Sequence, residues 1–221
     1  GFTCTQLFVQ NGAKVVMGDI NEEALQKAAE SLNTEDVAVL AGDVSDKSYN
    51  QQLAKLAVDR FGKIDGAYFN AGIEGKVANI QDCQEEDYQK VLDVNAKGPW
   101  LGIQAVASEI EKSGGSVLIT SSVAGLRGMA GLFPYVMSKH AVHGLMKCAA
   151  LELGPKGGRV NSIHPGPVDN RMMDSIHKQF SPDDPNAFQQ GFETKIPKGR
   201  YATNQDIANL ALFLMSDEST Y

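Results

Sequence analysis

The chain alternates short, almost continuously apolar segments with longer segments of helical periodicity. Five apolar segments predict strands, at 13–20, 36–44, 63–72, 115–122 and 158–166. Helical patterns lie between and after them, at 21–32, 45–62, about 85–112, 134–154 and 204–216. Strands without polar alternation are buried on both faces, which is typical of a parallel sheet covered by helices. With right-handed crossovers, the sequence predicts one α/β domain built on a doubly wound, Rossmann-like parallel sheet.

Polar and glycine-rich residues follow the predicted strands where those strands end. They are Asp19, Asp43, Asn70, Ser122 and Gly166, each with its neighbours. The carboxyl ends of parallel strands share one edge of a sheet, and ligands bind outside that edge. We therefore expect these residues to surround one site.

Both ends of the chain lead us to expect further elements. Residues 1–12 predict a helix that runs into the first predicted strand, and Gly1 resembles the last glycine of a phosphate-binding turn. We expect a fold truncated at both ends, without its first strand and its last edge strand. Loss of a central strand would leave unpaired edges on its neighbours.

Composition and charge argue against several classes of partner. A formal net charge of −7 disfavours nucleic acid and anionic membranes, because both attract a basic face. No apolar segment is long enough to span a bilayer. His140 and His143 lack a third ligand nearby in the sequence, so we expect no metal site. Cys4, Cys83 and Cys148 show no metal-binding spacing, and we expect reduced thiols in a cytoplasmic protein.

Tyr135 and Lys139 lie four residues apart on a predicted helix, so they share one face of it. An ammonium group beside a phenol stabilises the phenolate and lowers the tyrosine pKa from its usual value of about 10. A tyrosine of this kind can exchange a proton with an alcohol near neutral pH. The alternative is an exposed Tyr–Lys pair on a helix surface. A strand that ends in Ser121 and Ser122, followed by a glycine-rich loop, favours an active site.

Five motifs occur in the order and spacing of one enzyme family. They are NAG at 70–72, N at 95 within VLDVNAKG, SS at 121–122, YVMSK at 135–139 and HPGPV at 164–168. Together they resemble the short-chain dehydrogenase/reductase family over almost the whole chain. The resemblance implies a nicotinamide-dependent oxidoreductase with a Ser-Tyr-Lys mechanism. It also implies a homodimer or homotetramer that assembles through the helices at 85–112 and 134–154.

The resemblance implies roles for four catalytic residues. Tyr135 is expected to be the general acid/base. Ser122 is expected to hydrogen-bond the substrate oxygen and stabilise developing charge, with Ser121 as its rival. Lys139 would lower the tyrosine pKa and hold the nicotinamide ribose. Asn95 would interrupt its helix and hold a water that relays protons to bulk solvent.

Asp19 indicates which dinucleotide is expected. It ends a predicted strand eighteen residues after Gly1, near the offset at which an acid holds the ribose hydroxyls of NAD. The 2′-phosphate of NADP would meet this carboxylate as a like charge, and Ile20 follows rather than an arginine. We therefore predict NAD as the cofactor. With the resemblance added, the expected cofactor contacts are Gly1, Asp19, Ile20, Asp43, Val44, Asn70, Ala71, Gly72, Tyr135, Lys139, Pro165, Gly166, Val168 and Asn170.

The segment 171–200 predicts a substrate lid, because it combines two proline-containing stretches with an amphipathic middle. Met172, Met173, Phe180 and Phe188 suggest an apolar pocket, so we expect a cyclic or hydrophobic secondary alcohol or its ketone. One alternative is a 3-oxoacyl thioester reductase, which usually uses NADPH and an acidic carrier protein. A non-catalytic dinucleotide-binding module is the other. Enoyl reductases of this fold use a wider tyrosine–lysine spacing.

Overall fold

The structure is a computed structural model that describes residues 1–220. Its strands are β1 (Val15–Asp19), β2 (Val37–Ala41), β3 (Gly66–Phe69), β4 (Ser116–Thr120) and β5 (Arg159–Ile163). Its α-helices are α1 (Phe2–Gln10), α2 (Glu22–Leu32), α3 (Lys47–Phe61), α4 (Glu85–Leu92), α5 (Gly98–Ser113), α6 (Phe133–Leu153), α7 (Arg171–Phe180), α8 (Pro185–Glu193) and α9 (Asn204–Met215). Shorter turns are the π-helical η1 (Asp93–Lys97) and the 3₁₀ turns η2 (Val123–Gly125) and η3 (Gly154–Lys156). The order of strands and helices agrees with the alternation predicted from the sequence.

Local sequence signals explain several helix boundaries. Asn21 caps α2, at the start of the predicted range 21–32, and its side chain accepts a hydrogen bond from the N–H of Ala24 at 2.9 Å. Helix α3 is capped by Asp46, one residue after the start of the predicted range 45–62. It ends at Gly62, which adopts the left-handed conformation with φ of 86°. The predicted boundaries are therefore correct to within about two residues.

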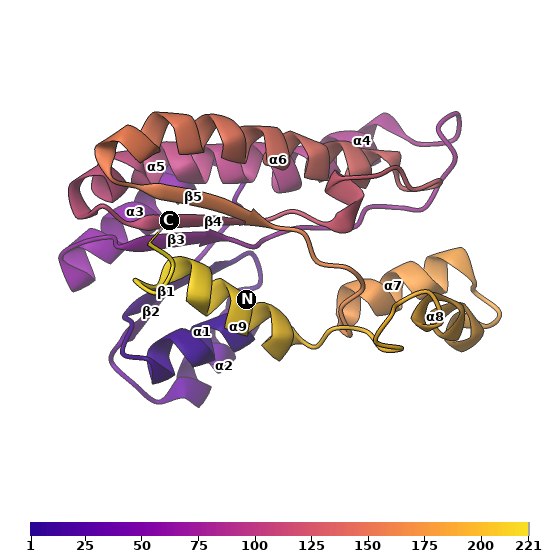
Figure 1. The fold of residues 1–221 in the computed structure, drawn as a ribbon, viewed down its shortest axis with the longest axis horizontal. Coiled ribbons are helices and arrows are strands. Elements are labelled where there is room, and N and C mark those ends of the chain that lie inside the picture. The colour runs from indigo at the N-terminus through magenta and orange to yellow at the C-terminus, as the bar shows by residue number, and fades with distance from the viewer. Residues whose placement is uncertain (221) are drawn as a thin grey trace.

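All strand pairs are parallel, but the strands form two sheets. One contains β1 and β2, and the other has the order β3-β4-β5. Within residues 1–220, β1 and β3 do not pair, and a cavity of about 1650 Å³ lies along their facing edges. Figure 1 shows α5 and α6 above the three-stranded sheet, with α1 and α9 on its other side. The two sheets thus keep their carboxyl ends on the same side of a Rossmann-like fold.

Strand β4 is buried on both faces, as its apolar composition predicts. Val117 and Ile119 pack against α5 and α6, whereas Leu118 faces α1 and α9. All three side chains are 0% exposed, and complete burial of such a side chain contributes about 1.5–3 kcal/mol. This packing fixes the position of β4 and therefore of the serines that follow it.

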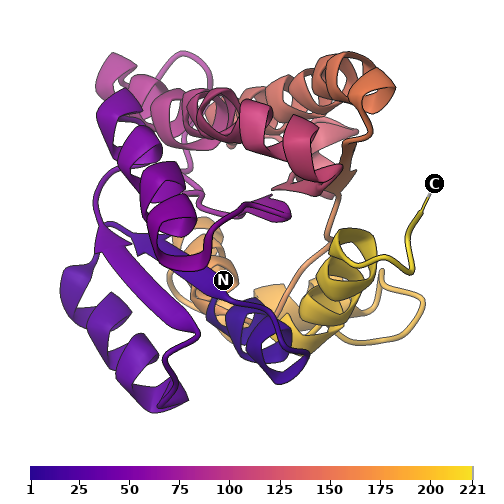
Figure 2. The same cartoon turned by 90° about the vertical axis from the view of Figure 1, so that its left-hand side faces the viewer.

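Helices α7 and α8 form a separate corner of the molecule, beyond the carboxyl ends of the strands (Figure 1). They occupy most of the segment predicted as a lid. Figure 2 shows the same pair behind the gap between the upper and lower helical layers. None of the helices in the described part of the chain has both the length and the apolarity that crossing a membrane requires.

Candidate active site

A cavity of about 1680 Å³ opens at the carboxyl ends of the strands. Every residue predicted to bind the cofactor lines it, and so do Ser122, Tyr135 and Lys139. Of the predicted site residues, Asn95 alone is absent from the lining. This volume exceeds that of a typical small-molecule pocket, so it has room for a dinucleotide and a substrate together.

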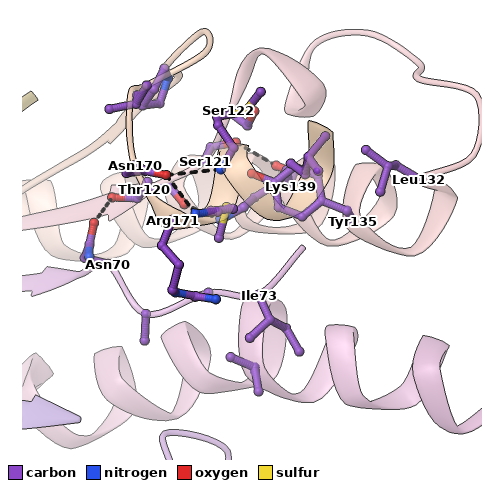
Figure 3. Close-up of a pocket in the computed structure, with 18 of the residues that line it drawn as sticks. Asn70, Ile73, Thr120, Ser121, Ser122, Leu132, Tyr135, Lys139, Asn170 and Arg171 are labelled. Carbon is purple, nitrogen blue, oxygen red and sulfur yellow. Dashed lines mark hydrogen bonds between the residues drawn. The ribbon is translucent and has the colours of Figure 1, made fainter. Parts of the chain in front are cut away.

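Ser121 and Ser122 follow β4 but have different surroundings. Ser121 is buried, and its Oγ donates to the carbonyl oxygen of Lys139 at 2.9 Å. Ser122 is half-buried and its Oγ accepts from the N–H of Ala124 at 3.1 Å. Because a hydroxyl that accepts one bond still has its proton to donate, Ser122 can bind a further oxygen in the cavity (Figure 3). The geometry favours Ser122 over Ser121 as the hydroxyl available to a substrate.

Tyr135 and Lys139 are buried in the first half of α6, as Figure 3 shows. The Nζ atom of Lys139 lies 5.5 Å from the centroid of the tyrosine ring and donates to the carbonyl oxygen of Thr120 at 2.8 Å. Burial raises the pKa of Tyr135, while contact with the Ser122 hydroxyl lowers it and the Glu74 carboxylate raises it further. Burial also lowers the pKa of Lys139 to about 8.

The balance of these effects reverses one expectation from the sequence. The spacing of Tyr135 and Lys139 predicts a lowered tyrosine pKa, but in this structure burial is the largest influence on that pKa and raises it. The same burial destabilises the charged form of Lys139. Sequence spacing could show that the two side chains share a face, but it could not show how little water reaches them.

Asn95 lies in η1, the π-helical turn between α4 and α5, so the predicted long helix is interrupted where the resemblance implies. Its Oδ1 accepts from the N–H of Ile73 at 2.8 Å. Its Nδ2 donates to the carbonyl oxygen of Ile73 at 2.8 Å and to Oγ of Ser138 at 3.0 Å. Ser138 in turn donates to the carbonyl oxygen of Tyr135 at 2.7 Å. The Asn95 side chain therefore ties the loop after β3 to the catalytic helix, and its role in a proton relay remains a prediction.

The segment 70–72 joins the end of β3 to this network. Thr120 donates from Oγ1 to Oδ1 of Asn70 at 3.1 Å. A Cβ atom on Gly72 would lie 3.3 Å from Oδ1 of Asn95 and 3.5 Å from Nζ of Lys139. A side chain at this position would therefore press on Oδ1 of Asn95 and touch Nζ of Lys139, and the glycine leaves both groups undisturbed.

Asp19 and Asp43 lie at the other end of the cavity, just after β1 and β2. Asp19 accepts from the N–H of Asn21 at 2.9 Å, and Asp43 accepts from the N–H of Ser45 at 2.8 Å. Both bonds go to Oδ1, which leaves Oδ2 of each carboxylate for a ligand. Nearby, Gly1 precedes α1, and no side chain caps this helix, so the N–H groups of its first turn are available to an anion.

Val168 and Asn170 border the cavity on the side of Tyr135. Val168 forms a parallel bridge with Ala202. In this bridge the carbonyl oxygen of Pro167 accepts from the N–H of Ala202, and the N–H of Asp169 donates to the carbonyl oxygen of Ala202. Since neighbouring residues of an extended segment point their polar groups to opposite sides, those of Val168 face away from the bridge. Asn170 uses its Oδ1 to cap α7 and retains its Nδ2 as a donor.

Two helices of the predicted lid supply the apolar wall of the cavity. Lining residues from α7 and α8 are Met172, Met173, Ile176, Phe180, Phe188 and Phe192. The rings of Phe180 and Phe188 are stacked, with centroids 5.4 Å apart. Gln179 of α7 accepts from the N–H of Val77 at 2.8 Å and donates to the carbonyl oxygen of Gly75 at 3.3 Å. These bonds connect the lid to the loop that Asn95 holds.

Several residues of the site were not singled out from the sequence. Ser138 is fully buried within the YVMSK motif. His164 hydrogen-bonds the carbonyl oxygen of Ser122 through Nδ1 at 3.1 Å and Oγ of Ser162 through Nε2 at 2.9 Å, so it fastens the Ser122 segment to β5. Both residues lie inside the quoted motifs, and this place in the motifs could have pointed to them as site residues. Gln179 had no local signal, because its partners lie about a hundred residues away in the sequence.

The histidines show no metal-binding arrangement in the described residues. His140 hydrogen-bonds the carbonyl oxygen of Val136 through Nδ1 at 2.9 Å. His143 packs its ring edge-on against His164, with centroids 4.7 Å apart. Residues 1–220 contain no cluster of three or more side chains suited to a metal ion.

Known proteins are similar in sequence to this chain over nearly its whole length. The family model described as "Enoyl-(Acyl carrier protein) reductase" matches residues 1–221. Levodione reductase from Leifsonia aquatica is 35% identical over 215 residues, which cover 95% of this chain and 80% of that protein. The 3-alpha-(or 20-beta)-hydroxysteroid dehydrogenase from Mycobacterium tuberculosis is 39% identical over 223 residues, which cover 100% of this chain and 80% of that protein.

Solved structures show the same architecture. A crystal structure of levodione reductase superimposes with a TM-score of 0.95 at 32% identity, covering 100% of this chain and 88% of that one. NAD+-bound xylitol dehydrogenase gives a TM-score of 0.91 at 30% identity, covering 100% of this chain and 89% of that one. The fold, the match along the whole chain and these relatives confirm the resemblance drawn from the motifs. The chain belongs to the short-chain dehydrogenase/reductase family and is an oxidoreductase of that family.

Proposed function

We propose that this oxidoreductase interconverts a secondary alcohol and its ketone with NAD(H), and that Tyr135 is the general acid/base. One observation carries the proposal. The cavity brings Ser122, Tyr135 and Lys139 together at one end and a strand-terminal carboxylate, Asp19, at the other. The catalytic end suits proton transfer to a substrate oxygen, and the far end suits the ribose of a dinucleotide.

Each residue at the catalytic end has its own role in the proposed reaction. Ser122 donates its hydroxyl proton to the substrate oxygen and orients it towards the tyrosine. Tyr135, as phenolate, removes the hydroxyl proton of the alcohol, and as phenol it returns that proton to a ketone. Lys139 lies beside the ring and, when protonated, favours the phenolate. When NAD is bound, its nicotinamide accepts the hydride that leaves the alcohol carbon.

The structure offers groups that fit each part of NAD. The polar backbone groups of Val168 and the Nδ2 donor of Asn170 suit the nicotinamide carboxamide. The uncapped first turn of α1 suits a phosphate. The free carboxylate oxygen of Asp19 suits two ribose hydroxyls, and it would repel the 2′-phosphate of NADP. NAD is therefore the proposed cofactor, and NAD+-bound xylitol dehydrogenase is a structural neighbour.

The apolar wall supports a cyclic or hydrophobic substrate. Met172, Phe180 and Phe188 present methionine and aromatic surfaces to the space in front of Tyr135. Such surfaces bind apolar rings and offer few partners for the hydroxyls of a sugar. A relative at 39% identity is named for hydroxysteroids, which are ring-bearing apolar alcohols.

Three alternatives receive less support. The matching family model is described by an enoyl reductase, but the spacing of Tyr135 and Lys139 is the shorter one, which we associate with alcohol and ketone chemistry. A 3-oxoacyl thioester reductase would suit NADPH and a basic docking face, whereas Asp19 and the net charge of −7 oppose both. A non-catalytic dinucleotide-binding module is disfavoured because the cavity holds Ser122, Tyr135 and Lys139 together. Assembly as a homodimer or homotetramer and a cytoplasmic location remain predictions.

The test is a spectrophotometric assay of nicotinamide reduction with a panel of cyclic and acyclic secondary alcohols, run with NAD and NADP separately. We expect turnover with NAD that is lost in Tyr135→Phe, while the variant still binds NADH. Asp19→Ala should weaken NAD binding more than NADP binding. Activity only with charged sugars or acyl-carrier substrates would refute the proposed substrate class. NADH binding without turnover of any alcohol or ketone would favour the non-catalytic alternative.

A further inference from the structure

We propose that Arg171 binds the pyrophosphate of the dinucleotide and so links cofactor binding to the position of helix α7. The proposal rests on the proposed function, because it takes a nicotinamide dinucleotide as the ligand of the cavity. It concerns a residue that the sequence motifs did not single out. It also gives the predicted lid a physical connection to the cofactor.

The guanidinium of Arg171 lines the cavity and has no side-chain partner among residues 1–220. Arg171 is the first residue of α7, and its side chain extends from the helix into the cavity (Figure 3). It forms no ion pair and no side-chain hydrogen bond with any of residues 1–220. Two other arginines are engaged: Arg159 donates to the carbonyl oxygens of Leu214 at 2.7 Å and Ser216 at 3.0 Å, and Arg200 donates to Asp206. Arg127 also lines the cavity without a side-chain partner among residues 1–220, but Arg171 is the one carried by helix α7. A charge without partners in a ligand cavity is available for the ligand.

The backbone that carries Arg171 is held firmly. The bridge between Val168 and Ala202 fixes the segment just before it. Asn170 accepts hydrogen bonds through Oδ1 from the N–H groups of Met172 at 3.0 Å and Met173 at 3.3 Å. Asn170 already accepts from the N–H groups of the first turn of α7, so these groups are not available to an anion. An anion at this position would therefore bind the charge of Arg171 rather than the helix terminus.

Arg171 lines the same cavity as the residues proposed to hold the two ends of a dinucleotide. Tyr135 and Val168 border the end proposed for the nicotinamide, and Asp19 and Asp43 border the end proposed for the adenosine. A dinucleotide that spans both ends must place its pyrophosphate between them. Two carboxylates at the adenosine end repel phosphates, so binding there gains from a full positive charge. A guanidinium can donate two parallel hydrogen bonds to a phosphate.

Binding at Arg171 would also affect the substrate side of the cavity. The same helix carries Met172, Ile176 and Phe180, which belong to the apolar wall. At its other end, Gln179 bonds to the loop after β3. A phosphate held at the start of α7 would therefore restrain the whole helix, and the apolar wall would be completed only after the cofactor has bound.

The experiment measures equilibrium binding rather than turnover. NADH affinity is followed by fluorescence titration, and affinity for ADP-ribose, which contains the adenosine and the pyrophosphate without nicotinamide, by calorimetry. The variants are Arg171→Gln and Arg171→Lys. Lys178→Gln is the matched control, because it removes the same charge from the same helix at an exposed residue outside the cavity lining.

We expect Arg171→Gln to raise the Kd of NADH and of ADP-ribose by the same factor, about tenfold, as for the loss of one charge-assisted contact. Arg171→Lys should recover part of the affinity, and Lys178→Gln should stay within about twofold of the wild type. The dependence of log Kd on log salt concentration should be shallower in Arg171→Gln.

Three outcomes separate the possible failures. An unchanged Kd for both ligands in Arg171→Gln would overturn the proposal while leaving NAD binding intact. Weaker binding of NADH with unchanged binding of ADP-ribose would also overturn it, because the contact would then be with the nicotinamide half. A wild-type protein that binds neither ligand would refute the proposed function itself.

Discussion

The buried lysine of the active site should reduce the stability of the folded protein at neutral pH. Lys139 is 3% exposed, and burial lowers its pKa from 10.5 to about 8. At about 1.4 kcal/mol per pH unit, this difference corresponds to about 3 kcal/mol. Below pH 8 the lysine is protonated in both the folded and the unfolded protein, so the full penalty applies.

The sign of the pH dependence follows from the two pKa values. Between pH 8 and 10.5 the unfolded protein still binds a proton that the folded protein has released. The wild type therefore gains stability as pH rises through this window. Lys139→Met removes the titrating group, but it also removes the hydrogen bond to the carbonyl oxygen of Thr120, which contributes about 1 kcal/mol at any pH.

We therefore expect Lys139→Met to be more stable than the wild type by about 2 kcal/mol at pH 7. The advantage should shrink as pH rises and reverse near pH 10. The assay is urea unfolding at a series of pH values between 7 and 10, followed by circular dichroism. Lys147→Met, an exposed position on the same helix, is the control and should give a difference that does not vary with pH.

The refuting result is a specific one. If the difference in unfolding free energy between wild type and Lys139→Met were constant from pH 7 to 10, the ammonium would not be desolvated in the folded protein. The variant should be inactive whichever result is obtained, because no cation would then stand beside the catalytic phenol. A gain in stability with a loss of activity would show that Lys139 contributes to activity at the expense of folding stability.

Three further predictions test the surroundings of the site. Glu74→Gln should lower the pKa of Tyr135, because the Glu74 carboxylate raises that pKa. The pH profile of kcat/KM for alcohol oxidation should then reach its plateau at lower pH, and an unchanged profile would contradict this prediction. Ser138→Ala should reduce the free energy of unfolding by about 1–3 kcal/mol, since the buried Nδ2 of Asn95 loses one of its two acceptors and keeps only the carbonyl oxygen of Ile73; a loss below about 0.5 kcal/mol in urea unfolding would show that the freed N–H finds another partner. Gln179→Leu removes two hydrogen bonds from α7 to the loop after β3. It should therefore raise KM for the alcohol more than it changes kcat, and it should speed proteolysis within 171–200. Equal effects on KM and kcat would refute a role of Gln179 in the predicted lid.

The elements and the position of the site could be predicted because they depend on local patterns. The apolar run of β4 predicts burial on both faces, and Val117, Leu118 and Ile119 are all buried. The spacing of Tyr135 and Lys139 places them on one helical face wherever the helix lies. Strand ends in a parallel sheet share one edge, so Asp19 and Ser122 were expected to border one cavity, and both line it.

Other features depend on contacts between distant segments. The order of the two serines could not exclude Ser121, whose hydroxyl is engaged by the backbone of Lys139. Asn95 was expected at a helix interruption, but its partners Ile73 and Ser138 lie 22 and 43 residues away.

The sequence by itself indicated which residues are expected to carry the chemistry and determined which edge of the fold they occupy, because periodicity and motif spacing are properties of the chain. Only the tertiary structure decided their electrostatics. Burial raises the pKa of Tyr135 and lowers that of Lys139, against the expectation from their spacing, because desolvation depends on every segment packed around them. The tertiary structure also leaves the guanidinium of Arg171 in the cavity without a side-chain partner among residues 1–220, because the partner of a charge depends on which groups lie beside it in space.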